Sequence, residues 1–542
     1  MVGLCYRVYQ VVYLMFLVLP ASHSHASSHS LPLAGKFFGF NAPQWEDFGG
    51  NNWSNPMFIG NVSATLQPGF IRYPGGTVAN YWDWKRGAFF VDGRINWTAS
   101  KVSWYRDQPY RPYTYADLAI ACNATKATPI FVVNMLYSNL TYELEGLHAA
   151  EKAGLMVQYV ELSNEIYQSN DDILRRWPTS ADYAAEANKW AAAIFNHFGD
   201  DVFISAVSAY SDHSGVEAQR YWDFASMTYR SSLNTDVIKG LTIHMYQGSG
   251  HSCEPKHGKG KGSWGNSSAQ QAQFDDFKSP GGVARLIDNA RRSMQVLSDA
   301  RAARIPPGLS IGVTEFNMYD TCGPIRQTWA HGLYVGVMVQ RLLATPRIHH
   351  ATLHALSGNP MFTALYTYNN TLAGLLLKNY SAVPYTQPYT PTPAGIVIAA
   401  ANIAARGGGD TSTTTQEVIF DANGHLAAHM FANESNVTGN IFLPSGNTPQ
   451  HVVGLFLLNV GPRASVLQLP TQWVVKGCVL RGKIVSALSG PTSWVTSTDS
   501  VFVSAFELNA TESVHVKNER GYGQISSVLV PPYAVAHAVQ QC

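Results

Sequence analysis

The chain has 542 residues, of which 46% are hydrophobic and 13% are charged, and its formal net charge is +1. This length exceeds one ordinary domain and the apolar content can fill a large core, which excludes an intrinsically disordered protein. A net charge so close to zero argues against a nucleic-acid partner bound through its phosphates.

Residues 1–26 have the features of a secretory signal peptide. Arg7 lies in the n-region, an apolar stretch covers Val11–Leu19, and a small-residue cleavage site follows at Ser24-His25-Ala26. The stretch is shorter than the roughly 20 residues of a membrane span, although a signal anchor is an alternative. We expect a secreted or extracellular protein without a membrane span after signal removal; a lumenal or lysosomal location is also compatible.

Glycosylation sequons and cysteines agree with a secretory route. The sequons begin at Asn52, Asn61, Asn96, Asn123, Asn139, Asn266, Asn369, Asn379, Asn433, Asn436 and Asn509. After loss of Cys5, the remaining cysteines are odd in number, so one is a free thiol or bridges to another chain. The predicted disulfides are Cys253–Cys322 and Cys478–Cys542, which leaves Cys122 over.

Strand-like apolar runs alternate with helical stretches over residues 27–407. The runs cover residues 35–41, 68–76, 128–136, 156–165, 201–210, 239–247, 309–317 and 349–358. Helical patterns cover residues 182–197, 281–302, 328–344 and 393–406. Eight strands that alternate with helices predict an α/β fold, a (β/α)8 TIM barrel rather than an open doubly wound sheet.

The pattern changes after the glycines at 407–409. Residues 412–542 contain short β-branched runs separated by turn residues, and no long helical pattern interrupts them. This predicts a C-terminal all-β sandwich domain.

Two of the predicted barrel strands end in a carboxylate. The segment VELSNE ends in Asn164 and Glu165, and the segment IGVTEFN has Glu315 at its centre. The carboxyl ends of barrel strands form the floor of an active site, so the two carboxylates are predicted to face each other there. A pair of carboxylates is the minimum equipment for hydrolysis of a glycosidic bond, one as the acid and one as the nucleophile.

The Asn-Glu pair on strand four and the later glutamate on strand seven resemble clan A of the glycoside hydrolases. This resemblance implies that Glu165 is the acid/base and Glu315 the nucleophile. It also implies that Asn164 binds the 2-hydroxyl of the sugar being cleaved.

Further motifs carry the same resemblance. The segment RYPGG at residues 72–76 resembles α-L-arabinofuranosidases and related families, which implies that Arg72 orients the nucleophile and keeps it ionised. The segment IHMYQ resembles the His/Tyr pair of the clan, so Tyr246 would bond Glu315 and His244 would line the pocket. The C-terminal β domain resembles that of arabinofuranosidases and heparanase-like glucuronidases.

Strand eight departs from the clan pattern. Many clan members place a tryptophan there beneath the sugar, whereas this chain has His354. The stacking surface is therefore predicted at Tyr81, Trp82 and Trp84, which follow RYPGG; packing in the core of the barrel is the alternative for each.

These observations predict a secreted retaining O-glycosidase that acts on polysaccharides or glycoconjugate glycans, with arabinofuranosidase-like specificity favoured. The alternatives are a heparanase-like glucuronidase, a catalytically inactive carbohydrate-binding protein and a structural glycoprotein. No cofactor or metal is predicted, because the cluster of His251, Cys253 and His257 is more typical of a solvated or disulfide-bonded loop. The G-x-G-x-x-G within residues 258–265 follows no strand, which argues against a nucleotide site.

Overall fold

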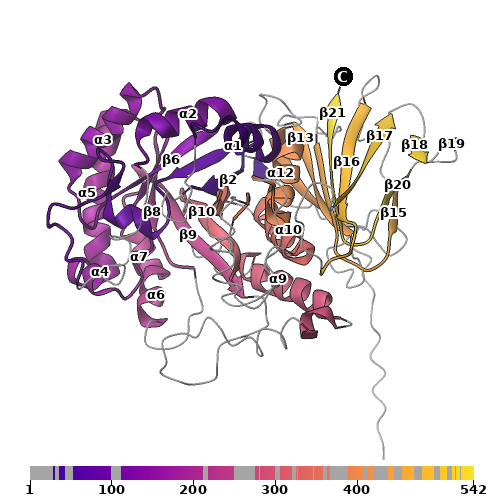
Figure 1. Ribbon diagram of the computed structural model, residues 1–542. Coiled ribbons are helices and arrows are strands. Elements are labelled where there is room, and N and C mark those ends of the chain that lie inside the picture. The colour runs from indigo at the N-terminus through magenta and orange to yellow at the C-terminus, as the bar shows by residue number, and fades with distance from the viewer. Residues whose placement is uncertain are drawn as a thin grey trace, which may run out of the picture.

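Figure 1 presents the computed structural model of the chain. It describes residues 29–30, 36–42, 53–98, 112–210, 218–248, 275–279, 281–298, 305–319, 325, 328–345, 347–357, 363–366, 389–406, 413–419, 437–444, 454–468, 479–492, 501–509, 515–518, 521–524 and 527–541. The predicted signal peptide, the four cysteines of the predicted disulfides and the cluster of His251, Cys253 and His257 lie outside these residues. Cys122 is a free, buried thiol.

Eight parallel strands close into a barrel, as the sequence predicted. Each strand pairs with the next one along the chain, and the last pairs with the first. The strands are β2 (Phe38–Asn41), β3 (Phe70–Tyr73), β6 (Thr128–Val133), β7 (Tyr159–Leu162), β8 (Phe203–Val207), β9 (Ile238–Gly248), β10 (Ser310–Tyr319) and β11 (Ile348–His354). Strands buried on both faces consist of near-continuous apolar runs, which is why this part of the fold is readable from the sequence.

Helices surround the barrel (Figure 1). The longer ones are α2 (Tyr115–Thr125), α3 (Leu140–Lys152), α5 (Ser180–Phe198), α9 (Gly282–Ser298), α10 (Trp329–Ala344) and α12 (Pro393–Ala405). Short elements are α1 (Pro56–Asn61), η1 (Val62–Leu66), η2 (Thr77–Tyr81), α4 (Asp171–Arg176), α6 (Ala218–Phe224), α7 (Met227–Ser231) and the hairpin of β4 (Trp82–Asp83) with β5 (Ala88–Phe89). None of the helices within the described ranges has the length and apolar character to cross a membrane.

Capping boxes fix the starts of two barrel helices. Thr114 and Asp117 cap α2, and Thr179 and Asp182 cap α5, each by reciprocal bonds between side chain and backbone. These bonds satisfy backbone N–H groups that have no partner inside the helix.

Helices α10 and α12 lie between the barrel and the C-terminal sheet (Figure 1). Both are apolar around most of their circumference, as expected for helices covered on two sides. Gly454 permits the close approach of the sheet, because a Cβ atom there would lie 1.8 Å from the carbonyl oxygen of Ala404. Gln340 of α10 also exchanges two hydrogen bonds with Thr438, at 2.8 and 2.7 Å.

The C-terminal region is an antiparallel β domain. Its main sheet has the order β1-β12-β13-β14-β21-β16-β17-β18-β19, and β15 pairs with β20 in a separate sheet. These strands are β1 (His29–Ser30), β12 (Thr413–Ile419), β13 (Val437–Pro444), β14 (Gly454–Asn459), β15 (Ser465–Gln468), β16 (Val479–Ala487), β17 (Val501–Asn509), β18 (His515–Asn518), β19 (Gly521–Gln524), β20 (Ser527–Val530) and β21 (Ala534–Gln541).

Strand β1 is an unexpected member of this sheet. His29 and Ser30 fall in the range that the sequence assigned to the barrel, but they pair with Thr415 and Thr414 at the edge of the C-terminal sheet. An edge strand offers unpaired backbone groups to any extended segment, and this pairing leaves no mark in a side-chain pattern.

Candidate active site

Two carboxylates meet at the carboxyl end of the barrel. Glu165 follows β7, and Glu315 lies in the second half of β10. One oxygen of each carboxylate and Nδ1 or Nε2 of His244 all lie within 4.8 Å of one another. Glu315 is the more buried carboxylate, with a side chain 5% exposed against 16% for Glu165. The two groups therefore have different environments, as an acid and a nucleophile require.

Glu315 sits among hydrogen-bond donors. Arg72 donates from Nη1 to Oε1 at 2.8 Å, and Tyr246 donates its hydroxyl to Oε2 at 2.5 Å. The Nδ1 atoms of His244 and His354 lie 3.6 and 3.8 Å from Oε2. Burial by itself would raise the pKa of Glu315, but His244, His354, Arg72 and the bond from Tyr246 outweigh it and hold the pKa well below its ordinary value. Glu315 is thus an ionised carboxylate.

The guanidinium of Arg72 organises the floor of the site. It is fully buried on β3 and donates to four side chains. Besides Glu315, it binds Glu161 through Nε at 2.6 Å, Asn164 through Nη2 at 2.8 Å and Asn41 through Nη1 at 3.2 Å. The planar fork of an arginine suits such a set of fixed acceptors.

Glu165 lies on an unusual turn. Its φ is 46°, and Ser163 has a φ of 78°, so both occupy the left-handed region that non-glycine residues rarely adopt. Asn80 of η2 supports the turn: its Oδ1 accepts from the Ser163 hydroxyl at 2.8 Å and from the Asn164 N–H at 3.0 Å, and its Nδ2 donates to the Asn164 carbonyl at 2.7 Å.

The carboxylate of Glu165 has three partners. His244 Nδ1 lies 2.8 Å from Oε1, which also accepts from the Tyr167 hydroxyl at 3.1 Å. Gln168 donates to Oε2. The side chain is held in place yet remains partly open to solvent, which suits a group that exchanges protons with a substrate and with water.

A β-bulge shapes β10 at the site. Val313 pairs with Ile243 and Glu315 pairs with His244, so Thr314 is the extra residue against β9. A bulge changes which way the following side chains point. Here Thr314 reaches Glu161 and His244, and the next residue, Glu315, reaches Arg72.

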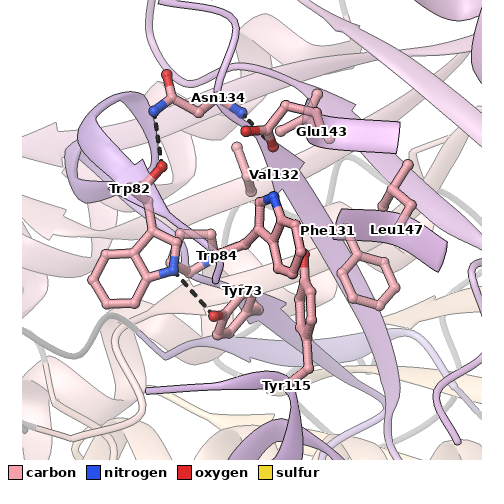
Figure 2. A pocket seen from close by; sticks show the side chains of 11 residues that line it. Tyr73, Trp82, Trp84, Tyr115, Phe131, Val132, Asn134, Glu143 and Leu147 are labelled. Carbon is pink, nitrogen blue, oxygen red and sulfur yellow. Dashed lines mark hydrogen bonds between the residues drawn. The ribbon is translucent and has the colours of Figure 1, made fainter. Parts of the chain in front are cut away.

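The structure brings together Glu165, Glu315, Asn164, Arg72, His244 and Tyr246, but not the two predicted tryptophans. Trp82 is 3% exposed and donates to the hydroxyl of Tyr73, while Trp84 donates to the carbonyl of Tyr142. Figure 2 shows both at a small pocket beside Asn134 and Glu143. None of their contacts in the described residues involves the carboxylate pair, so their place agrees with the packing alternative. Tyr81 is likewise buried, against Trp97 and Tyr137.

Glu143 is a buried carboxyl in this second pocket. Its Oε2 accepts from the backbone N–H of Asn134 at 3.2 Å, and burial raises its pKa to about 8. In the unfolded chain the group titrates near 4.5. Between these two values the folded state keeps a proton that the unfolded state has lost, so this group makes the protein less stable as the pH rises.

The Glu143→Gln variant is expected to remove this pH dependence. The amide oxygen can keep the bond from Asn134, and no proton is taken up. From pH 5 to pH 8, the unfolding free energy of the variant should therefore increase by about 1–3 kcal/mol relative to that of wild type. Urea unfolding of both proteins at the two pH values measures this difference. An identical pH dependence in the two proteins would show that Glu143 stays ionised in the folded state.

Sequence reasoning missed six residues of the site: Asn41, Asn80, Glu161, Tyr167, Gln168 and Thr314. Asn41 and Glu161 lie on predicted strands. For Glu161 a signal was available, because residues i and i+2 of a strand share a face, which places Glu161 on the same face as the polar Ser163. Asn80 acts through a short helical turn and Thr314 through a bulge, and neither has a recognisable pattern in the sequence.

The trio of Glu165, His244 and Glu315 also offers one imidazole and two carboxylates to a cation. Each already has protein partners at hydrogen-bond distance, so the trio is accounted for without an ion. The absence of a metal cofactor stays a prediction.

Comparison with known proteins supports the fold. No family model and no curated protein matches the sequence. A GH51 arabinofuranosidase from Xanthomonas axonopodis pv. citri aligns with a TM-score of 0.60 at 12% identity, over 95% of this chain and 97% of that chain. The α-L-arabinofuranosidase from Thermotoga maritima, solved as an arabinose complex, aligns with a TM-score of 0.53 at 12% identity, over 94% and 97%.

A third solved structure is a 4-O-α-L-rhamnosyl-β-D-glucuronidase from Fusarium oxysporum 12S. It aligns with a TM-score of 0.54 at 14% identity, over 96% of this chain and 98% of that chain. The chain shares the fold of these glycoside hydrolases. The predicted architecture, a barrel followed by a β domain as in arabinofuranosidases and glucuronidases, is confirmed.

Proposed function

We propose that the protein is a secreted retaining O-glycosidase that hydrolyses polysaccharide or glycoconjugate glycans by double displacement. The observation that carries this proposal is the separation of the two carboxylates, whose nearest oxygens lie within 4.8 Å. Retaining enzymes hold their carboxyl groups about 5–5.5 Å apart, whereas inverting enzymes leave about 6.5–9.5 Å for a water molecule.

In the first step, an oxygen of Glu315 attacks the anomeric carbon of the sugar. The bond between that carbon and the leaving oxygen breaks, and Glu165 gives its proton to this oxygen. The low pKa of Glu315 supports its role as nucleophile, because the attacking carboxylate must be ionised. The product is a glycosyl ester of Glu315.

In the second step, Glu165 takes a proton from water. The water oxygen attacks the anomeric carbon, the ester bond breaks, and Glu315 leaves as a carboxylate. Asn164 is proposed to bind the 2-hydroxyl of the sugar: its Nδ2 is buried and has no hydrogen-bond partner in the part of the chain that the structure describes. A donor held in this way can gain a bond as the transition state forms.

For the substrate we favour an arabinofuranosidase-like specificity, on the RYPGG motif that carries Arg72. A glucuronidase-like specificity is the alternative, since a glucuronidase has the same fold. A panel of aryl arabinofuranosides and aryl glucuronides separates the two.

An inactive carbohydrate-binding protein is the competing function. Such a protein has no need for an ionised nucleophile paired with a more exposed acid, yet Arg72 and Tyr246 hold Glu315 in that state. The complete set of bonds around both carboxylates favours the enzyme.

Secretion is part of the proposal. Its support is the signal-like segment at residues 1–26 and the sequon asparagines, of which Asn96, Asn123 and Asn139 are exposed on the folded domain. Exposed sites of this kind can accept a glycan without unfolding.

The Glu165→Ala variant tests the proposed function. Loss of the acid should lower kcat/KM for aryl glycosides with poor leaving groups by about 10²–10⁴-fold. Dinitrophenolate leaves without protonation, so attack by Glu315 on dinitrophenyl glycosides should remain fast, and the slow step should become the attack of water on the glycosyl ester. Azide should then restore turnover and give a glycosyl azide of retained configuration.

Glu145→Ala, at an exposed position on α3, is the matched control and should leave every rate unchanged. Equal losses for good and poor leaving groups, together with no rescue by azide, would refute the role of Glu165.

A further inference from the structure

Glu161 is a buried carboxylate that the two-step mechanism does not use. It lies on β7 with no exposed surface and forms an ion pair with Arg72 at 2.6 Å. Its second oxygen, Oε1, accepts the hydroxyl of Thr314 at 3.0 Å. A buried charge is costly to desolvate, so its retention without a role in the proposed chemical steps needs a reason.

The hydroxyl of Thr314 has only one hydrogen. The ion-paired Glu161 can only accept, so this hydrogen points to Glu161. The oxygen of Thr314 can then only accept from its other neighbour, Nε2 of His244, at 3.2 Å. It follows that Nε2 of His244 carries a proton.

The other ring nitrogen faces the acid. Nδ1 of His244 lies 2.8 Å from Oε1 of Glu165, a distance that requires a hydrogen between the two atoms. Because the Nε2 proton is fixed by Thr314, one further proton is shared by Nδ1 and the carboxylate. Either His244 is doubly protonated beside an ionised Glu165, or it is neutral beside a protonated Glu165.

We propose that Glu161 and Thr314 are positioning residues that fix the Nε2 proton of His244, so that His244 and Glu165 together hold one mobile proton. This inference rests on the proposed function. The mobile proton is the one that passes from Glu165 to the leaving oxygen in the first step. It is replaced in the second step by the proton that Glu165 takes from water. The Nε2 proton stays in place throughout.

The chain of hydrogen bonds from Glu161 through Thr314 to His244 also affects how firmly His244 and Glu165 hold the mobile proton. Once the pair has lost it, the lone pair of Nδ1 faces the carboxylate of Glu165 at 2.8 Å, which is unfavourable. With the Nε2 proton fixed, the contact between Nδ1 and Oε1 is favourable only while the pair holds its proton, which favours the return of a proton from water in the second step. If Nε2 were free to lose its proton, neutral His244 could adopt the other tautomer, with its proton on Nδ1. Nδ1 would then donate a hydrogen bond to the ionised carboxylate of Glu165.

Several charged or titratable groups face this pair. They are Tyr167 after β7, Glu161 on β7, Glu315 on β10, Arg72 on β3, Tyr246 on β9 and His354 on β11. All of them are unchanged in a variant of Thr314. A shift in the pH profile of that variant consequently reports on the hydroxyl.

The Thr314→Val variant removes the hydroxyl at nearly constant volume. For an aryl glycoside with a poor leaving group, the basic limb of kcat/KM against pH should move to lower pH by about one unit, the size expected from one added hydrogen bond to a carboxylate. The profile for a dinitrophenyl glycoside should keep its basic limb. Thr314→Ser retains the hydroxyl and should restore the wild-type profile.

Thr242→Val is the matched control. Thr242 is buried on β9, two residues before His244, and its hydroxyl has no hydrogen-bond partner among the described residues. This variant makes the same chemical change in the same barrel and should leave the profile unmoved. If Thr314→Val does not fold, Thr314→Ala makes the same test without the second methyl group.

The outcomes separate the inference from the proposed function. A wild-type protein without activity on any glycoside overturns the proposed function and the inference with it. An active wild type whose basic limb is the same in Thr314→Val, or is shifted equally by Thr242→Val, overturns only the inference. A shift that Thr314→Ser reverses supports it.

Discussion

The Glu315→Ala variant is expected to lose essentially all glycosidase activity. In the proposed mechanism Glu315 forms the glycosyl ester, and removal of a covalent nucleophile costs on the order of 10⁴-fold or more in kcat. The fold should persist, because Arg72 keeps its ion pair with Glu161 at 2.6 Å. Hydrolysis of an activated aryl glycoside and thermal unfolding of the variant measure the two effects.

Azide distinguishes this variant from the one at the acid. In Glu315→Ala, a small anion can enter the space of the missing carboxylate and attack the anomeric carbon directly. Glu165 still protonates the leaving group, so the glycosyl azide should have the inverted configuration. A retained azide product from Glu315→Ala, or turnover within tenfold of wild type, would contradict the assignment of the nucleophile.

The Arg72→Met variant is expected to have the largest effect on stability. It leaves the carboxylates of Glu161 and Glu315, both buried at the floor of the site, without their cation. Loss of one partner from a buried ion pair costs about 3–5 kcal/mol of unfolding free energy. Urea unfolding at neutral pH measures the change, and a low yield of folded protein is its practical consequence.

Arg285→Met is the control for this substitution. Arg285 pairs with Asp276 at 2.7 Å, but both side chains are about half exposed, at 51% and 53%. A solvated pair contributes about 0–1 kcal/mol, so this variant should unfold close to wild type. Equal losses at Arg72 and Arg285 would show that Arg72 is not needed to compensate the buried carboxylates.

The pH dependence of the activity of Arg72→Met tests the effect of Arg72 on Glu315. Arg72 is one of the groups that lower the pKa of Glu315. Without it this pKa rises, and the nucleophile is protonated over more of the acidic range. The acidic limb of kcat/KM against pH should therefore move to higher pH, in the opposite direction to the change expected for Thr314→Val.

The barrel and much of the site were predictable from the sequence for one physical reason. Strands buried on both faces are runs of apolar residues, and a polar residue at the end of such a run stands out. Glu165 and Glu315 were found in this way, and Arg72, His244 and Tyr246 came from short motifs on other strands. The structure brings all five into contact. Their catalytic roles stay predictions until the variants are measured.

The remaining residues depend on features that a strand pattern does not contain. Thr314 points into the site because β10 has a bulge, and Asn80 reaches the Glu165 turn from a short helical segment. Trp82 and Trp84 follow the RYPGG motif closely, but their indole N–H groups bond to Tyr73 and to the carbonyl of Tyr142. Proximity in sequence to a site motif does not determine which side of a loop an aromatic ring faces.

The stereochemistry of the first-formed product tests the central claim most directly. A panel of aryl glycosides identifies a sugar that the enzyme releases, and proton NMR then follows the anomeric signal of that sugar before mutarotation. The separation of Glu165 and Glu315 predicts that the first product has the same anomeric configuration as the substrate. A first product of inverted configuration would contradict the double displacement and the role of Glu315 as a covalent nucleophile.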